Sequence, residues 1–321
     1  MRKADRPVAG FSGLSPESGS QPFRGVVIAN HGRHVMVASD GRHVLCHLRG
    51  KKASAVVGDH VLWHPAESQG VIDQVIERRN LLYRQDETRV KSFAANLDQV
   101  LILIAAEPAY STRQLARALI AAEAAGIPAT IGLNKSDLHE PFQRAWDSLA
   151  PYRAMDYSVL PLCLRKADDT ARHNLNQWCQ NKTTLVLGPS GAGKSTLINL
   201  LCPDALAQTA ELSNALKSGR HTTTGTTMYR VENHSGTFLI DSPGFQEFGL
   251  QHIAASRLQG LMRDIHRHAH GCRFYNCTHR HEPGCRVIAA ITTDNEETSL
   301  DKERYQIYCE LFMELSRPPV R

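Results

Sequence analysis

The stretch GPSGAGKST, Gly188 to Thr196, constrains the fold of this chain more than any other feature. An apolar segment, TTLVLG, leads into it, and KSTLINLLC continues from it with the pattern of a helix. Glycines at the spacing Gly-x4-Gly-Lys-Ser let backbone N–H groups surround phosphate oxygens at a helix N-terminus. A mere glycine-rich turn is the competing interpretation, and the flanking strand and helix disfavour it. From Leu97 onwards apolar strands alternate with helical segments, so we predict an α/β domain with a parallel sheet.

The side chains of this loop suit a nucleoside triphosphate and its magnesium ion. Lys194 would reach the β- and γ-phosphates, and the Ser195 hydroxyl would ligate Mg²⁺. The residues assigned to phosphate binding are Gly188, Pro189, Ser190, Gly191, Ala192, Gly193, Lys194, Ser195 and Thr196.

A second motif, NKSD, supplies a way to read the base. Asn134, Lys135, Ser136 and Asp137 follow an apolar strand, Ile127 to Leu133, as base-reading loops do at the carboxyl edge of such sheets. Asp137 can accept hydrogen bonds from guanine N1–H and the 2-amino group, Asn134 can bond the opposite edge, and the Lys135 stem can lie over the ring. Alone, these four residues are an ordinary turn. Together with the phosphate loop they predict GTP and GDP rather than ATP as the ligand.

Two more segments complete the expected magnesium site. Asp241 begins DSPG at the end of the strand TFLI and can hold Mg²⁺ through water, while the Gly244 N–H can meet the γ-phosphate. Upstream, the polar loop GRHTTTGTT offers several hydroxyls, and we select Thr223 as the Mg²⁺ ligand. The alternative for that loop is a flexible segment without a ligand.

The hydrolytic group is harder to assign. Ras-like GTPases position the attacking water with a glutamine directly after DxxG, but Phe245 stands there in this chain. A phenyl ring cannot orient water by hydrogen bonding, so we expect slow intrinsic hydrolysis. His221 in the threonine loop is our candidate catalytic residue, and a solvated loop histidine is the alternative.

The region before the α/β domain has the pattern of a small β-barrel. Short segments from Phe23 to about Gln85 alternate apolar and polar residues between Gly and Asp turns, which fits a five-strand Greek-key barrel of the oligonucleotide-binding type. Its basic residues form either a nucleic-acid face or ordinary solvated turns. Residues 1–22 are rich in Ser, Gly and Pro, so we predict a disordered tail without a secretory signal.

Cysteine spacing near the C-terminus predicts a metal site. Cys272, Cys277, His279 and Cys285 bring three thiols and an imidazole into a short stretch, the closed four-ligand set of structural zinc. We expect one Zn²⁺ per chain. Disulfides or reduced buried thiols are the alternatives, and His281 can take the place of His279.

Charge and hydropathy narrow the remaining possibilities. Residues 263–286 hold five arginines against two acids, with Phe274 and Tyr275 among them, which suits RNA phosphates and exposed bases or else a solvated basic face. No run of 18 apolar residues exists, so no membrane span is expected. We expect a cytoplasmic monomer, because the cysteines are typical of reduced thiols and no heptad pattern requires a dimer.

Circular permutation explains why NKSD precedes the phosphate loop. Joining the natural ends of a GTPase and opening new ends gives the order base loop, phosphate loop, threonine loop, DxPG. This order and the GRHTTT stretch resemble the RsgA (YjeQ) family of small-subunit assembly GTPases. The strand after NKSD, which we place at Val159 to Leu164, ends in Cys163 and Leu164 where the family has a Ser-Ala pair. Because the segment after DSPG leads into the C-terminal domain, hydrolysis is expected to move that domain.

The resemblance implies a multidomain chain and a partner. We expect a tail at 1–22, an OB-fold barrel at 23–85, a permuted α/β P-loop GTPase domain at 86–250 and a helical zinc-binding domain at 251–321. The implied function is late maturation of the 30S ribosomal subunit, with contacts to 16S rRNA and hydrolysis stimulated by the subunit. A GTP-gated rRNA-binding module with incidental turnover is the alternative. A metabolic nucleotide kinase is disfavoured, because nothing resembles a second substrate pocket.

Overall fold

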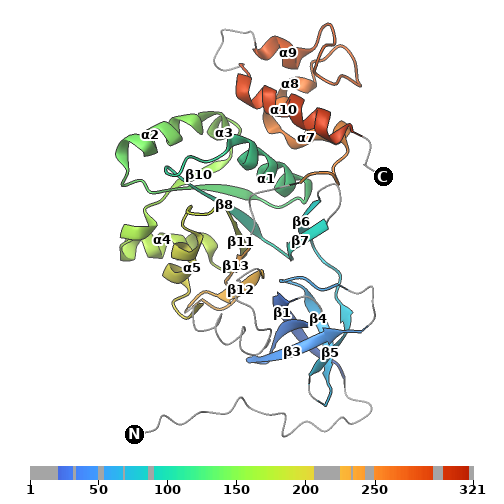
Figure 1. Ribbon diagram of the computed structural model, residues 1–321, viewed down its shortest axis with the longest axis vertical. Helices are drawn as coiled ribbons and strands as arrows, with labels where there is room; N and C mark the ends of the chain where they lie inside the picture. Colours follow the sequence, from blue (N-terminus) through green and yellow to red (C-terminus); the bar gives the residue numbers. More distant parts are fainter. Residues whose placement is uncertain are drawn as a thin grey trace.

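The computed structural model describes residues 21–31, 34–49, 54–67, 69–85, 90–205, 225–232, 234–242, 249–291 and 299–317. Its elements succeed one another along one long axis. A β-barrel lies at one end, a sheet flanked by helices lies in the middle, and a helical C-terminal region lies at the other end (Figure 1). His221, Thr223 and Gly244 are outside the described residues.

Five strands form the barrel: β1 (Phe23–His31), β2 (His34–Ser39), β3 (Arg42–Leu48), β4 (His60–Pro65) and β5 (Gly70–Val75). β1 pairs with β2, β2 with β3, β3 with β5 in parallel, β5 with β4, and β4 back with β1. The last pairing closes the barrel, so no open edge remains between β1 and β4. Alternating residues such as Val35, Val37 and Trp63 fill its interior. The predicted five-strand barrel is confirmed.

The central sheet has the order β10-β9-β8-β11-β13-β12. The strands are β8 (Gln99–Ala105), β9 (Ala129–Asn134), β10 (Ser158–Pro161), β11 (Thr183–Leu187), β12 (Thr227–Arg230) and β13 (Phe238–Asp241). All pairings are parallel except that of β12 with β13. The chain builds outwards from β8 in one direction and from β11 in the other. The β8–β11 boundary is therefore a topological switch point, where α/β sheets bind ligands beyond the carboxyl ends of the strands.

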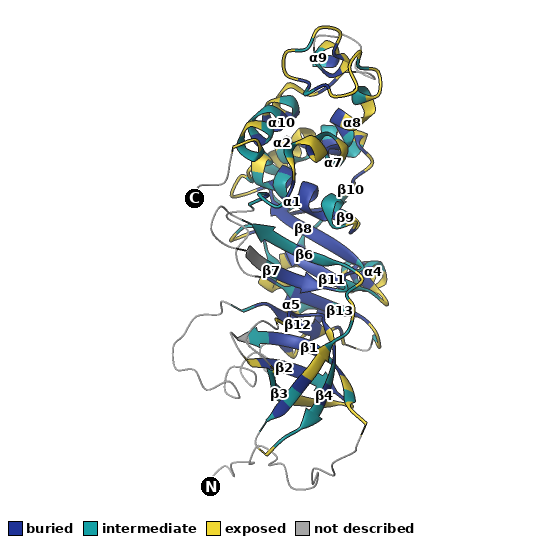
Figure 2. Ribbon diagram, turned by 90° about the vertical axis from the view of Figure 1, so that its right-hand side faces the viewer, coloured by how far each residue is buried: buried dark blue, intermediate teal, exposed yellow. Residues whose placement is uncertain are grey.

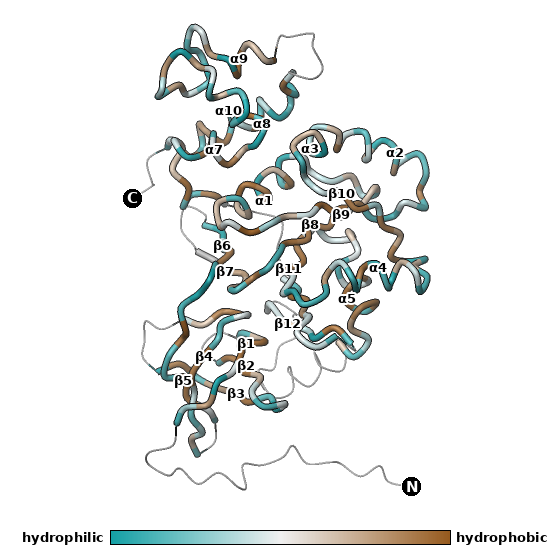
Figure 3. Tube along the Cα trace, turned by 180° about the vertical axis from the view of Figure 1, so that it is seen from behind, coloured by the Kyte–Doolittle hydropathy of each residue, from teal (hydrophilic) through white to brown (hydrophobic). Residues whose placement is uncertain are grey.

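Both faces of this sheet are covered. β8 is buried throughout, and Figures 2 and 3 show it as a buried, hydrophobic strand. Its Val100, Ile102 and Ile104 belong to one core, and Leu101 and Leu103 to another. The first core includes helix α1 (Thr112–Ala124), and the second includes α4 (Asp169–Cys179) and α5 (Lys194–Leu201). Near-continuous apolar sequence in a strand thus reflects burial on both faces.

The segments that connect the strands β8, β9 and β10 are helical. Ser111 caps α1 by accepting a hydrogen bond from the Gln114 amide. α2 (His139–Ser148) and α3 (Ala150–Ala154) connect β9 to β10. The strand expected at Val159–Leu164 was too long: β10 ends at Pro161, and a 3-10 turn spans Leu164–Lys166.

A two-stranded ribbon joins the barrel to the sheet. β6 (Leu81–Gln85) and β7 (Val90–Ala95) pair antiparallel. The Gln85 amide donates to the Gly249 carbonyl at 3.0 Å, and the Gln251 amide donates to the Gln85 carbonyl at 3.0 Å. The chain that follows DSPG therefore docks on β6. A second junction lies at Ala29 of β1, which pairs with Thr227 of β12.

The C-terminal helices pack against α1 and α3. They are α7 (Leu258–Leu261), α8 (Arg263–Ala269), α9 (Arg286–Ile291) and α10 (Lys302–Leu315), with a 3-10 turn at Ala255–Arg257 before them. Residues of α7, α8 and α10 share one hydrophobic core with α1. Ion pairs surround this contact: Arg113–Glu310, Arg117–Glu314, Arg263–Glu123 and Arg267–Asp156. Among the described residues, no helix has the length and apolar character needed to cross a membrane.

Candidate nucleotide site and Cys3His cluster

The phosphate loop lies at the switch point, between β11 and α5. Gly188 has φ 157° and Gly193 has φ 108°. A Cβ on Gly188 would lie 2.1 Å from the Leu103 carbonyl oxygen, and one on Gly193 would lie 2.4 Å from Asn134 Nδ2. Both positions therefore require glycine, because any side chain would collide with the neighbouring strand or with the base-reading loop.

Two opposite charges, Lys194 and Asp241, influence each other beside this loop. Lys194 Nζ donates to the carbonyl oxygens of Gly188 at 2.7 Å and Pro189 at 3.2 Å. Burial lowers the pKa of Lys194, and the charge of Asp241 opposes that effect. Burial also raises the pKa of Asp241, against the pull of Lys194. Within the described residues, Asp241 Oδ1 and Ser242 Oγ are buried without hydrogen-bond partners. Unsatisfied acceptors of this kind suit a hydrated cation, so the donor set fits Mg²⁺ held by Ser195 and Asp241.

Asn134 joins the base-reading loop to its two neighbours. Its Nδ2 donates to the Ala192 carbonyl at 2.9 Å, and its Oδ1 accepts from the Leu164 amide at 3.0 Å. The side chain is buried. Sequence reasoning gave Asn134 a direct bond to the base. The two loop contacts leave the second N–H of Nδ2 and the second lone pair of Oδ1 for a nucleotide.

Asp137 and Lys135 remain at the surface of the site. Asp137 pairs with Lys166 at 3.2 Å, and this contact, with further bonds including one from Cys163, lowers the pKa of Asp137 although burial opposes it. The carboxylate is thus kept ionised, as an acceptor for two guanine N–H groups must be. Lys135 adopts φ 70° and donates to the Glu107 carbonyl. The Ser136 amide donates to the Leu162 carbonyl at 3.0 Å, which holds NKSD beside the segment after β10.

The threonine loop ends next to Asp241. Thr227, the first residue of β12, is the register partner of Asp241 in β13. The described chain begins two residues earlier, at Gly225. The roles predicted for Thr223, Gly244 and His221 thus remain predictions, because these residues lie outside the described chain.

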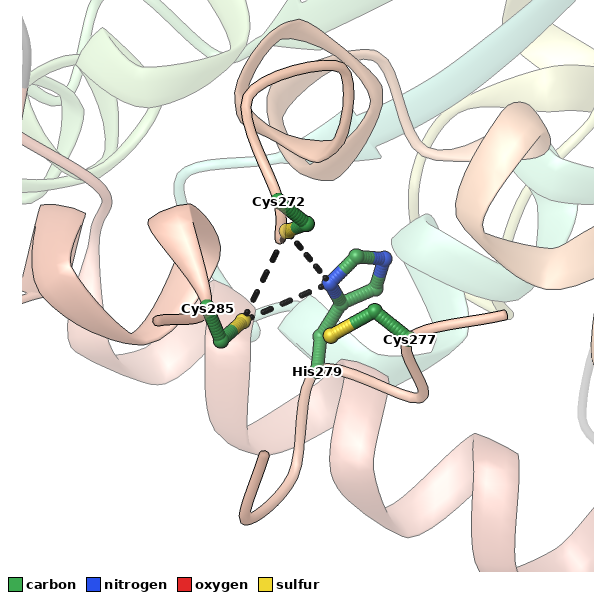
Figure 4. A group of neighbouring side chains, drawn as sticks. All are labelled: Cys272, Cys277, His279 and Cys285. Atoms are coloured by element: carbon green, nitrogen blue, oxygen red, sulfur yellow. Dashed lines mark hydrogen bonds between the residues drawn. The ribbon is translucent and has the colours of Figure 1, made fainter. Parts of the chain in front are cut away.

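Four ligand atoms converge in the C-terminal region (Figure 4). The ligand atoms of Cys272, Cys277, His279 and Cys285 all lie within 4.8 Å of one another. Sγ of Cys272 and of Cys285 are each 3.4 Å from His279 Nδ1, and they are 3.8 Å apart. A tetrahedral zinc ion with Zn–S near 2.3 Å and Zn–N near 2.0 Å requires separations of roughly 3.5 and 3.8 Å. The donor set and its spacing therefore fit zinc.

Two of the alternatives for these residues, the disulfides and His281, do not match the geometry. All eight cysteines lie in the described chain and are free thiols, so the disulfide interpretation was wrong. His279 is 1% exposed and lies in the cluster, whereas His281 is exposed to solvent.

Supporting residues around the cluster were not visible in the sequence. Gln259 Oε1 accepts from His279 Nε2 at 2.5 Å, which turns Nδ1 towards the sulfurs. Glu282 accepts from the Thr278 amide at 2.7 Å and from the Arg280 amide at 3.0 Å, and so holds the turn that carries His279. Tyr305 of α10 donates to the His279 carbonyl at 2.8 Å. A glutamine or glutamate near a Cys/His motif carries no signal of such a contact.

Basic and aromatic side chains project from the same region. Tyr275 is 99% exposed and Phe274 is 40% exposed, with the Arg273 guanidinium 5.5 Å from the Phe274 ring centre. Arg263 and Arg267 are used in ion pairs with Glu123 and Asp156. The surface contributed by Arg273, Phe274 and Tyr275 is called the aromatic tip below.

A phosphate loop on β11, a base-reading loop on β9 that comes earlier in the chain, and flanking barrel and Cys3His elements define a circularly permuted P-loop GTPase. The sequence profile of the RsgA GTPase family matches residues 75–251. The chain belongs to this family.

Individual relatives cover nearly the whole chain. It is 60% identical over 294 residues to the Small ribosomal subunit biogenesis GTPase RsgA of Variovorax paradoxus (strain S110), covering 91% of this chain and 92% of the relative. It is 46% identical to the protein of the same name from Paraburkholderia xenovorans (strain LB400), over 96% of this chain and 99% of that one.

Two solved structures share the fold. YjeQ from Thermotoga maritima matches with a TM-score of 0.69 at 26% identity, covering 92% of this chain and 99% of that one. YloQ, described as a circularly permuted GTPase, matches with a TM-score of 0.67 at 25% identity, covering 96% and 100%. The permuted α/β architecture predicted from motif order is thus confirmed.

Proposed function

We propose that this protein binds GTP with Mg²⁺ and hydrolyses it on the 30S ribosomal subunit during late assembly. The observation that carries the nucleotide part is Asn134, which joins the base-reading loop to the phosphate loop at the switch point of the sheet. The ribosomal part rests on relatives whose name refers to small-subunit biogenesis. We place the barrel at residues 23–85, the GTPase domain at 86–250 and the zinc domain at 251–321.

The nucleotide is held by groups of distinct chemistry. Residues Gly188 to Thr196 bind the phosphates, with Lys194 exchanging its carbonyl contacts for phosphate oxygens. Ser195, Thr223 and Asp241 hold Mg²⁺, and the Gly244 amide meets the γ-phosphate. Asp137 reads the N1–H and 2-amino edge of guanine.

Because Phe245 cannot orient water by hydrogen bonding, hydrolysis requires another group. His221 is the candidate, because the threonine loop ends at the register partner of Asp241. Comparison of subunit-stimulated turnover for His221→Ala and His234→Ala tests it. Equal turnover in the two variants would remove His221 from the mechanism.

One Zn²⁺ bound by Cys272, Cys277, His279 and Cys285 stabilises the C-terminal domain. This domain then presents the aromatic tip to 16S rRNA, where Tyr275 can stack on an unpaired base and Arg273 can contact phosphates. Weakening of subunit binding by added salt and by Tyr275→Ala supports this role, with Met313→Ala, an exposed apolar residue on α10, as the control.

We expect the protein to act in the cytoplasm. The deciding experiment is GTP turnover by the 321-residue protein alone and with 30S subunits, with 50S subunits and ATP as controls. A rise specific to 30S and GTP supports the proposal. Tight GTP-dependent binding to 30S without a rise favours the second candidate, a GTP-gated rRNA-binding module. Sedimentation of the free protein tests the expected monomer.

A further inference from the structure

His266 of α8 and His270, the residue that caps the C-terminus of this helix, form a pair outside the Cys3His cluster. His266 and His270 are four residues apart, and both are exposed. Their Nε2 atoms are 3.3 Å apart, and their ring centres are 4.6 Å apart. Residues at this spacing lie on one face of a helix, one turn above another. His268, between them in sequence, lies on the other side of the helix and is half-buried.

The separation of the two nitrogens distinguishes two interpretations. A hydrogen bond from one imidazole to the other has an optimum near 2.9–3.0 Å. Two imidazoles on one tetrahedral zinc, at Zn–N distances of about 2.0–2.1 Å, have nitrogens roughly 3.3 Å apart. The observed 3.3 Å therefore fits a shared metal better than a direct bond. Histidines at i and i+4 of a helix are also the pair that helical zinc sites use.

We propose that His266 and His270 bind a second zinc ion, with water in the two remaining tetrahedral positions. Within the described residues, no third histidine, cysteine or carboxylate joins this pair. With two protein ligands instead of four, the ion binds more weakly than at the Cys3His cluster and exchanges with solvent. The open positions face water, so they can also take an oxygen of an anionic ligand.

Zinc titration of the full-length protein tests the proposal. The protein carries its Cys3His zinc and is saturated with Mg²⁺ and GDP, so that the magnesium site is filled. Calorimetry and metal analysis after equilibrium dialysis against buffered free zinc are expected to show a second equivalent of zinc in wild type and in the control His268→Ala. The second equivalent is lost in His266→Ala and in His270→Ala, while the first is retained, which shows that the variants are folded.

Cobalt gives an independent readout. The second equivalent of Co²⁺ is expected to add the visible bands of a tetrahedral ion without the thiolate-to-metal bands of the Cys3His site. One equivalent of zinc in wild type would overturn the proposal. So would a second equivalent that survives in His266→Ala and His270→Ala.

Discussion

We expect a single change of side chain at Asp137 to alter which base the site accepts. Its carboxylate is ionised and paired with Lys166. Guanine offers it two donors, whereas xanthine has a carbonyl at C2, to which an amide can donate. Asp137→Asn is therefore expected to weaken GTP binding roughly 10–100-fold, since a hydrogen bond to a charged group contributes about 1.5–3 kcal/mol. The same variant should bind XTP more tightly than wild type does.

Competition of GTP and XTP against a fluorescent nucleotide measures both effects. Asp169→Asn is the matched control, because that carboxylate is 97% exposed at the start of α4. Loss of GTP binding without a gain for XTP would contradict the assigned contact of Asp137 with the C2 edge of the base.

A change at Gln259 tests how much zinc binding by the Cys3His cluster would depend on a residue that is not a ligand. Its Oε1 accepts the His279 Nε2 proton. Loss of such a partner typically weakens metal binding 10–100-fold. Gln259→Leu is expected to show a decrease of about that size in zinc affinity, measured by competition with a chelator. Gln259→Glu keeps the acceptor and should retain the affinity, so equal losses in both variants would point to packing instead.

These residues show where sequence reasoning stops. The ligands were predictable because thiols and an imidazole at close spacing have one common chemistry. Gln259 is 20 positions from His279, and only the packing of α7 against the Cys3His cluster brings the two side chains together. Likewise, the motif revealed Asn134 but not its contacts, because Ala192 and Leu164 approach it from two other loops.

At the scale of elements, the sequence pattern predicted strands and helices correctly where buried and exposed residues follow the period of the element. The alternation of the barrel strands and the continuous burial of β8 both follow from the number of faces that each strand covers. β10 was predicted too long, because apolar Leu162 and Leu164 continue its pattern after the strand has ended. Pairing of β1 with β12 joins residues almost 200 positions apart, and no local pattern encodes it.

A buried ion pair joins the helices α8 and α10, and we expect the loss of one partner to lower the free energy of unfolding. Arg304 is 5% exposed and donates to Asp264 at 2.7 Å, and Asp264 is 9% exposed. Arg304→Met would leave the Asp264 carboxylate buried without its partner, which is expected to cost about 3–5 kcal/mol of unfolding free energy. Chemical denaturation of the zinc-loaded protein measures this loss.

The double variant Arg304→Met with Asp264→Leu distinguishes the effect of the unpaired charge from the effect of lost packing. Because both charges are then absent, much of the lost stability should return. An Arg304→Met protein as stable as wild type would show that the pair contributes nothing, and a double variant less stable than the single one would show that packing around Arg304 dominates.

Across the whole molecule, the two segments that we expect to sense the γ-phosphate lead to elements that contact the barrel. The threonine loop ends at Thr227, which pairs with Ala29 of β1. The chain after DSPG returns at Gly249 and Gln251, which bond to Gln85 of the ribbon. By contrast, a shared core and four ion pairs fix the C-terminal helices to α1 and to the loop after α3. Motif order alone had suggested that the C-terminal domain moves.

The contacts predict instead that the barrel changes position with the nucleotide. Distance labels at Asp40 in the barrel, Asp169 on α4 and Gln306 on α10 allow two distances to be compared. The labels are attached to unnatural amino acids instead of cysteines, so that the thiols of the Cys3His cluster stay unmodified. Between GDP and a GTP analogue, the Asp40–Asp169 distance should change, while the Gln306–Asp169 distance stays constant because the docked helices move with α1. A change in the Gln306–Asp169 distance with a constant Asp40–Asp169 distance would show that the C-terminal domain moves instead. It would also mean that the ion pairs between α1 and α10 break during the cycle, a change that Arg117→Gln should then facilitate.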